Sequence, residues 1–257
     1  MKTIRLFLLA ALVMGALGSA VSQDEEKRTK EKRRYGTHND FAVDLGINNF
    51  LEDGQSPGNN NELYSVRPWG SWYVGLNSIN DTHVSGRLHL EWGGGVSWYN
   101  FKFEDESVRL EDGPDAVVFS QATDGLDHRK SKLTAAYVNV SAVPMLKFSA
   151  RRRYDRKWFN WGDDLDFTRR NHGGFRIGAG MYAGYRIASY TKYVFEENGD
   201  KEKDKDRDSF FLNNFRYGVR AQMGFRGVDL FFNYDLNELF ADSRGPELNA
   251  FSFGFIL

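Results

Sequence analysis

The last fifty residues alternate between apolar and polar side chains, and this alternation limits the fold more than any other feature of the chain. Apolar side chains occupy alternate positions from Phe215 to Phe225, from Val228 to Leu236 and from Phe251 to Leu257. Successive side chains of a β-strand point to opposite faces, so a period of two predicts three β-strands. Their succession predicts an antiparallel meander that closes at the C-terminus.

The composition of the two faces indicates which environment each one meets. The polar face combines glycines, such as Gly218 and Gly224, with the large cations Arg216 and Arg220. Glycine is a poor choice for an exposed strand face, whereas inside a narrow barrel it leaves room for large neighbours. We therefore expect the polar face to point inward and the Phe, Tyr, Leu and Val side chains to face lipid. A water-soluble barrel would need the opposite assignment.

Five earlier segments show the same alternation and complete a set of eight predicted strands. They cover about residues 40–49, 69–79, 84–103, 132–148 and 174–195. An even number of strands returns both chain ends to the periplasm, as a single-chain outer-membrane barrel requires. The predicted fold class is therefore all-β: a small eight-stranded antiparallel transmembrane β-barrel, built as a meander, with an interior filled by side chains.

The predicted connections alternate between long and short. Short turns are expected at Asn80–Thr82 and Arg226–Gly227, on the periplasmic side. Segment 151–172 breaks this rule, so it is either an unusually long periplasmic connection or a place where the strand count is wrong. Long loops are expected on the outer side at 50–68, 104–130, 196–208 and 239–246.

Two predicted strands contain local irregularities. After Trp98 the apolar pattern changes phase to Tyr99, Phe101 and Phe103, which a β-bulge or the end of the lipid zone would explain. Pro144 lies within another strand and lacks the donor for a ladder hydrogen bond. It should therefore mark a strand end, a bulge or a position outside the main ladder.

The N-terminal residues read as an export signal and a spacer. Lys2 and Arg5 precede an apolar run and small residues that suit cleavage, which predicts a signal peptide over 1–22. The apolar run is short for a transmembrane helix, which needs roughly 20 residues. Residues 23–39 mix both charge signs and predict a charged periplasmic linker. The predicted outer-membrane β-barrel domain then covers 40–257.

Composition excludes several classes of function. The chain contains no cysteine, so it forms neither a disulfide nor a lipoprotein anchor. Its net charge of -1 gives no bulk attraction to nucleic acid. Segment 151–172 mixes arginines with aromatic residues, as some nucleic-acid-binding segments do, but in an exported protein this mixture is more typical of a membrane interface.

Charged residues on the inward face are expected to pair with one another. An eight-stranded interior is only wide enough to be filled by side chains, and an unpaired buried charge is costly. We therefore predict a structural salt-bridge plug and no open pore. The residues of this predicted plug are Asp44, Glu91, Arg176, Arg186, Lys192, Arg216, Arg220, Asp229 and Asp235.

The sequence predicts no catalytic residue, no cofactor and no metal site. The five histidines show no paired ligand spacing, and the serines lack a nucleophile-elbow context. His83, Ser85 and His89 are the only weak candidates for a lipid-modifying enzyme.

Four segments resemble the PorT-like outer membrane β-barrel family. The first has a leading tyrosine and a central proline, Tyr137-Val-Asn-Val-Ser-Ala-Val-Pro144-Met-Leu-Lys147-Phe. The others are Ser189-Tyr-Thr-Lys192-Tyr, Asn214-Phe-Arg216-Tyr-Gly218 and Phe232-Asn-Tyr234-Asp-Leu236 followed by Leu239-Phe240. The resemblance covers roughly 40–257 and implies an eight-stranded outer-membrane barrel, with one branch of the family linked to protein secretion. The chain departs from the pattern at its end, Ile256-Leu257, where an aromatic final residue is usual.

These observations lead to one favoured function and two alternatives. We expect a non-enzymatic integral protein of the Gram-negative outer membrane with a structural or protein-interaction role, connected to protein secretion if the resemblance holds. Its partners would be the lipid bilayer and envelope proteins that contact loops 104–130 and 151–172, and no nucleic acid. The first alternative is a small outer-membrane enzyme that modifies lipid. The second is a soluble exported barrel that binds an apolar ligand.

Overall fold

The computed structural model describes residues 36–57, 63–148, 153–160, 166–172, 174–197 and 199–257, with 153–160 and 166–172 described by their backbone alone. The predicted signal peptide 1–22 and most of the predicted linker 23–39 lie outside these residues. The first strand begins at Thr37, so the last part of that linker belongs to the sheet.

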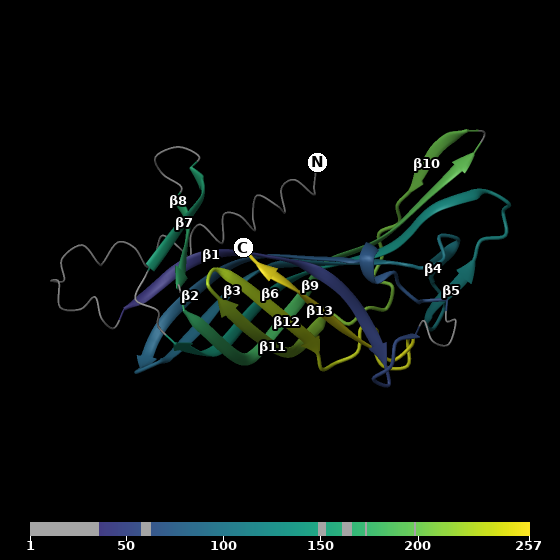
Figure 1. Cartoon of the computed structure of the whole chain (residues 1–257). Helices are drawn as coiled ribbons and strands as arrows, with labels where there is room; N and C mark the ends of the chain where they lie inside the picture. Colours follow the sequence, from purple (N-terminus) through teal and green to yellow (C-terminus); the bar gives the residue numbers. More distant parts are fainter. Residues whose placement is uncertain (1–35, 58–62, 149–152, 161–165, 173, 198) are drawn as a thin grey trace.

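Eight antiparallel strands are hydrogen-bonded in a ring (Figure 1). Each pairs with its neighbours in chain order, and the last strand pairs with the first, from Asp44 opposite Ile256 to Glu52 opposite Leu248. The strands are not spaced evenly around an axis. The ring strands are β1 Thr37–Glu52, β2 Trp72–Ser85, β3 Leu88–Lys102, β6 Asp127–Phe148, β9 Phe175–Glu197, β11 Phe215–Phe225, β12 Val228–Asp235 and β13 Leu248–Ile256.

The prediction of an all-β antiparallel meander of eight strands is confirmed at this level. The five other strands lie in the connections, as hairpins or as an added edge. These are β4 Val108–Asp112 with β5 Val117–Gln121, β7 Arg153–Asn160 with β8 Asp166–His172, and β10 Asp200–Asp204, which pairs with the outer part of β9. A short 3-10 helix, Pro68–Gly70, precedes β2.

The ring has a turn end and a loop end. The turn end contains the short connections β2–β3 and β11–β12 and the long connection β6–β9, whereas the loop end contains the other four connections, with β4, β5 and β10 at the right of Figure 1. The segment 151–172 belongs to the β6–β9 connection, where β7 and β8 pair with each other. Of the two explanations, the long connection is therefore correct, and the strand count stands. None of the described residues forms a helix long and apolar enough to cross a membrane.

The predicted turn at Asn80–Thr82 is wrong. These residues continue β2 in unbroken register with β3, where Asp81 lies opposite Glu91, and the turn follows at Gly86-Arg87. Gly86 adopts a positive φ of 56°, which a side chain would disfavour. Polar side chains are common in turns, and for this reason residues 80–82 were predicted to form one. Asp81 instead lies on the inner face of the ring, which is polar near this end.

Of the two explanations for the change of apolar phase after Trp98, the bulge is wrong. The pairing of β3 with β2 and β6 runs without a shift from Leu88 to Lys102, so no bulge is present in this part of β3. Tyr99 and Phe101 lie on the same inner face as Glu91 and are fully buried. What changes is the polarity of the interior, from charged near the turn end to aromatic near the loop end.

A bulge does occur in β9. Opposite Ala136 and Tyr137 of β6, the partners in β9 are Ala188 and Arg186, so Ile187 is the extra residue. The bulge moves the odd-numbered side chains inward beyond it, where Thr191 is completely buried. Lys192 therefore lies on the outer face, and its prediction as an inward residue is wrong.

Pro144 lies inside β6 and does not end the strand. It is opposite Leu90 of β3, and the pairing of β6 with β9 stops at Ala142 and resumes at Met145. Of the three expected explanations, the third applies: on the side toward β9, Pro144 lies outside the ladder of paired residues. The ring therefore accommodates the missing N–H donor at one local gap in a strand of 22 residues.

The loop end is closed by a hydrophobic core. The β4–β5 hairpin contributes the buried side chains of Val108, Leu110 and Val117, and the segment before β11 contributes Phe210. The phenol of Tyr193 in β9 donates to the Leu110 carbonyl oxygen at 2.9 Å and accepts from the Leu110 N–H at 2.6 Å. The β4–β5 hairpin within the 104–130 loop thus packs over the interior.

We expect Phe101→Ala to lower the free energy of unfolding by about 3–5 kcal/mol, because it removes a fully buried ring from this core. Urea unfolding followed by tryptophan fluorescence measures the loss. The control is Val118→Ala in β5, where the side chain is 46% exposed and its removal should change the free energy by less than about 0.5 kcal/mol. Equal losses for the two variants would contradict the placement of the core.

The hairpin should be held more tightly at low pH. Burial and a hydrogen bond with Asp208 raise the pKa of Asp112, and Asp206 adds to the shift. A carboxyl whose pKa is raised by folding stabilises while it is protonated, so this contribution is lost as pH rises through the folded-state pKa. Hydrogen exchange of residues 108–121, corrected for intrinsic rate, should be slower at about pH 4 than at about pH 7. Asp112→Asn should remove this dependence, and a dependence that survives the substitution would count against the contact.

Candidate functional site

Charged side chains from seven strands meet inside the turn end of the ring. Lys147 of β6 lies 2.6 Å from Asp81 and 2.9 Å from Glu91, measured from Nζ to the carboxylate oxygens. Arg176 of β9 lies 3.3 Å from Glu91 and 2.6 Å from Asp229. All five side chains are buried, so each charge depends on these partners for its stability. We call these residues, together with Asp44 and Arg220, the charged cluster.

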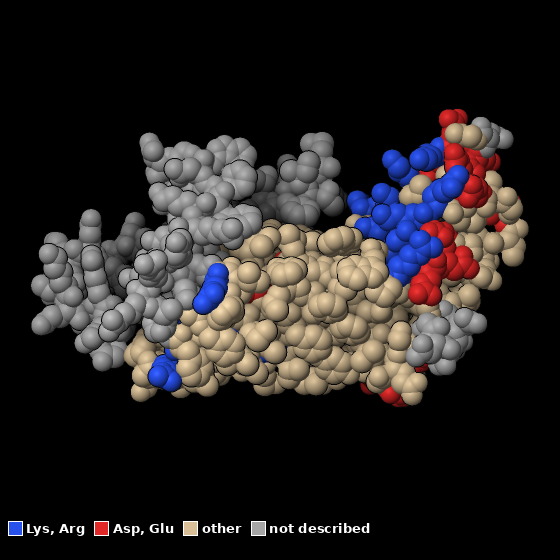
Figure 2. All heavy atoms as spheres, viewed as in Figure 1, with Lys and Arg blue, Asp and Glu red and all other residues tan. Residues whose placement is uncertain are grey.

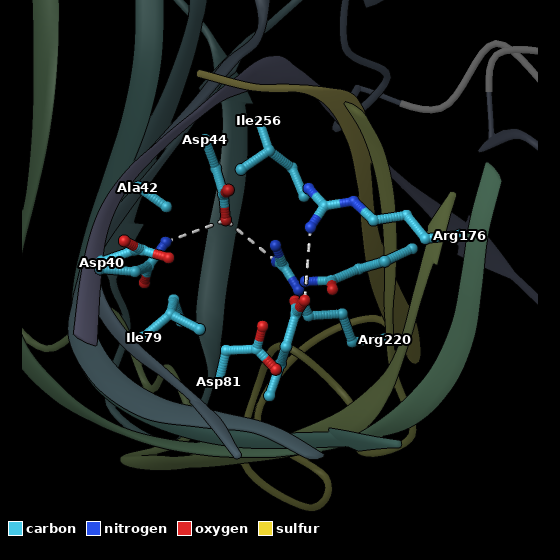
Figure 3. Close-up of a pocket in the computed structure, with 11 residues that line it drawn as sticks. Asp40, Ala42, Asp44, Ile79, Asp81, Arg176, Arg220 and Ile256 are labelled. Carbon is cyan, nitrogen blue, oxygen red and sulfur yellow. Dashed lines mark hydrogen bonds and ion pairs between the residues drawn. The ribbon is translucent and has the colours of Figure 1, made fainter. Parts of the chain in front are cut away.

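The second part of the cluster connects β1 with β11. Arg220 lies 3.0 Å from Asp44, which also accepts a hydrogen bond of 3.0 Å from the Asn77 amide (Figure 3). The Gln222 amide, with its nitrogen turned to the carboxylate, donates to Glu91 at 3.0 Å and accepts from Arg220 at 2.8 Å. Gln222 thus joins the two parts of the cluster into one network. A cavity of about 30 Å³ between these side chains is wide enough for a water molecule.

Glycine leaves the space that this network needs. A Cβ added at Gly224 would lie 2.1 Å from the Asp229 Oδ1 and 2.5 Å from the Arg176 Nε. At Gly184, a Cβ would lie 2.4 Å from Asn139 Oδ1 and 3.2 Å from the Arg216 Nε. The prediction that inward glycines make room for large neighbours is therefore confirmed at these positions.

Arg216 lies further toward the loop end, in an aromatic environment. Its guanidinium is 4.7 Å from the ring centroids of Tyr99 and Tyr137 and 5.1 Å from that of Tyr182. It donates to the Asn139 side-chain oxygen at 3.1 Å. Cation–π attraction is strongest for desolvated cations, so the three rings stabilise this buried charge. Asp235 accepts a hydrogen bond from the Tyr182 phenol.

The structure brings together most of the predicted plug. Asp44, Glu91, Arg176, Arg220 and Asp229 belong to the charged cluster, and Arg216 and Asp235 are buried beside the tyrosines. Arg186 is only half-buried and bonds to Ser189, Asn214 and the Leu212 carbonyl oxygen, so its inclusion among the ion pairs is wrong. Lys192 lies on the outer face, as described above.

Sequence reasoning missed Asp81 and Lys147, which are central to the cluster. Asp81 was assigned to a turn. Lys147 follows Pro144, where the strand was expected to end or deviate, although its odd number places it on the same face as Tyr137 and Asn139. The spacing of Lys147 from Tyr137, an even number of residues, is the signal that could have identified it.

The arrangement stabilises charge, and the weak candidates for catalysis lie at its turn end. The weak candidates His83 and His89 lie opposite each other on β2 and β3, with ring centroids 5.0 Å apart. His89 Nδ1 is 2.9 Å from Asp81, but the other oxygen of Asp81 is bound to Lys147. Asp81 thus serves the salt-bridge network as well as the histidine. Ser85 is exposed beside the turn. No cluster of metal-ligating side chains is found among the described residues.

Comparison with known proteins adds no assignment. No protein-family model, curated protein or solved structure matches the chain. The resemblance to the PorT-like family stays a prediction.

We expect Arg176→Gln to lower the free energy of unfolding by about 3–5 kcal/mol, because buried Asp229 would lose its ion pair with Arg176 and Glu91 would lose one of its two ion pairs. Adding Asp229→Asn should recover part of this loss, since it removes one unpaired carboxylate. A double-mutant cycle in urea unfolding measures the coupling. Additive losses would show that the two side chains do not depend on each other.

Proposed function

We propose that the chain is an integral β-barrel of the bacterial outer membrane. The supporting observation is an apolar belt: large hydrophobic side chains are exposed on the outer face of every ring strand, over paired charges inside. Its most exposed members are Leu45, Trp72, Leu88, Trp92, Val138, Val140, Leu146, Phe148, Phe175, Ile177, Met181, Tyr185, Ile187, Phe215, Tyr217, Val219, Met223, Phe225, Val228, Phe232, Phe253 and Phe255.

The belt is uncharged over most of the ring in Figure 2, and charged side chains gather mainly beyond its loop end. Monomeric soluble proteins rarely expose a continuous apolar patch of more than a few hundred Å². A surface that continues round all eight strands is much larger than such a patch. Lipid is the environment that matches it, because each exposed side chain would otherwise order water around it.

The length of the belt fits a bilayer. On β11 the exposed face runs from Phe215 to Phe225, a strand of 11 residues with six apolar side chains on that face. Ten steps of about 3.4 Å give roughly 34 Å along the strand. With a strand tilt of about 40°, the height is roughly 26 Å, close to the ≈ 25 Å band of outer-membrane barrels.

The packing of side chains in the interior supports a closed barrel and not an open pore. The charged cluster and the tyrosines around Arg216 occupy the turn end and the middle, and the hydrophobic core occupies the loop end. Eight strands enclose only enough space for side chains. We therefore propose a barrel with a side-chain-filled interior.

We further propose a non-enzymatic role in which the two ends contact other envelope proteins. The expected partner segments 104–130 and 151–172 belong to opposite ends of the ring, the first to the loop end and the second to the turn end. In the proposed orientation they would face the outside and the periplasm. The PorT-like resemblance would add a link to protein secretion. Affinity capture with variants lacking residues 108–121 or 153–172 would test each segment separately.

The two alternative functions make different demands. A soluble barrel that binds an apolar ligand needs its apolar face inside, whereas the described ring exposes that face. A lipid-modifying enzyme needs a reactive group at the rim, and His89 with Asp81 at the turn end is the nearest arrangement to one. Lipid analysis of a deletion strain tests this alternative, because loss of a modified lipid would replace the non-enzymatic proposal.

The proposal is tested by the electrophoretic mobility of the outer-membrane fraction, boiled and unboiled. We expect a heat-modifiable band in that fraction, since a closed barrel resists detergent until it is heated. Met181→Arg, in the middle of the belt, should lower the stability in bilayers by about 2–4 kcal/mol. The matched control is Lys201→Arg in the exposed strand β10, which should leave stability unchanged. Recovery of the protein in the soluble periplasm without a heat shift would overturn the proposal.

A further inference from the structure

Three lysines form a cross-strand row on the outer face, toward the loop end. Lys102 of β3 is paired with Lys132 of β6, and Lys132 is paired with Lys192 of β9. We call Lys102, Lys132 and Lys192 the lysine row. Like charges directly opposite each other in a sheet are destabilising. The ring therefore keeps an unfavourable arrangement at this position, which an anion would relieve.

The lysine row lies just beyond the apolar belt. Trp98, Ala136 and Ala188 form an uncharged row across the same three strands. Asn100, Thr134 and Tyr190 form the next row, and the lysines follow, with each row about 7 Å further along the strands. This succession of apolar, polar and cationic side chains is the order expected where a membrane protein leaves the hydrocarbon for the headgroups.

Further cations extend the row into a patch. Lys130 lies in the outer part of β6, and burial together with the charges of Lys132, Lys192 and Lys102 lowers its pKa. Lys205 approaches from beyond β10, with its Nζ 3.6 Å from the centroid of the Tyr190 ring. Figure 2 shows the resulting cluster of Lys and Arg between the uncharged surface and the acidic outer tip.

The protein's own carboxylates form ion pairs only at the edge of this lysine patch. Lys102 lies 3.7 Å from Glu106, but Glu106 is closer to Arg67, at 2.8 Å. The Lys132 ammonium donates to the Asn100 side-chain oxygen at 3.0 Å and lies 5.6 Å from the Tyr190 centroid. No carboxylate among the described residues forms an ion pair with Lys132 or Lys192. The centre of the row therefore keeps its positive charge available to a ligand.

We propose that the lysine row binds the phosphate-bearing headgroups of anionic lipids in the outer leaflet. This proposal rests on the membrane orientation proposed above. A lipid fits better than an acidic polypeptide, because the row is continuous with the apolar belt and one ligand can occupy both surfaces, with its acyl chains on the belt and its phosphate on the ammonium groups. Anionic headgroups attract lysines near a membrane surface by an amount equivalent to about fivefold in affinity for each lysine.

The test compares two double variants with the same change of charge. Lys132→Gln/Lys192→Gln removes the centre of the row, and Lys201→Gln/Arg207→Gln removes two exposed cations outside it. Each protein is first folded into phosphatidylcholine vesicles, where a heat-modifiable band shows insertion. The folded proteins are then extracted into detergent with equal amounts of phosphatidylglycerol and phosphatidylcholine, and native mass spectrometry counts the lipids that stay bound.

We expect the wild type and the control variant to retain phosphatidylglycerol preferentially, and the row variant to lose that preference by at least about fivefold. An unchanged preference in the row variant, or equal losses in the two variants, would overturn the proposal. So would polyglutamate that displaces phosphatidylglycerol and binds more tightly, since the occupant would then be an acidic polypeptide. Failure to insert into phosphatidylcholine would instead count against the membrane barrel itself.

Discussion

The pairing of the first ring strand with the last closes the sheet and gives it an inner and an outer face. Val43 and Leu257 exchange both of their backbone hydrogen bonds, at 3.0 and 2.8 Å, and the ladder continues from there to Glu52. Closure satisfies the backbone groups that an open sheet would leave at its edges. It also separates an inner face from an outer one, so each side chain belongs to one environment according to its position in the strand.

The polarity of the inner and outer faces reverses along the ring. Near the turn end the inside is charged and the outside apolar, whereas near the loop end aromatic residues are inside and lysines outside. The same sheet thus combines two opposite arrangements of polar and apolar side chains. Tyr99 and Trp98 lie next to each other at this transition, one fully buried and the other on the outer face.

The alternation of the sequence was sufficient to predict the number and order of the ring strands, because a period of two persists over long segments. It failed where the face that a residue occupies depends on its pairing with neighbouring strands. Asp81 resembled a turn residue until its pairing with Glu91 placed it inside, and Lys192 changed faces because of one extra residue, Ile187, in β9. The tyrosines around Arg216 come from three strands, and no local pattern connects them. The two errors of placement therefore arose from register, which a single strand does not reveal.

The closing ladder also has a consequence for the order of assembly. The strands that form it are separated by almost the whole length of the ring, so β1 lacks one of its two neighbours until β13 has been synthesised. Contacts that join distant parts of a chain form slowly, because the intervening chain must first be brought together. Until then β1 presents an unpaired edge beside the inner carboxylate of Asp44. We therefore expect the seam between β1 and β13 to be the last part of the ring to form, with the edge of β1 exposed until it does.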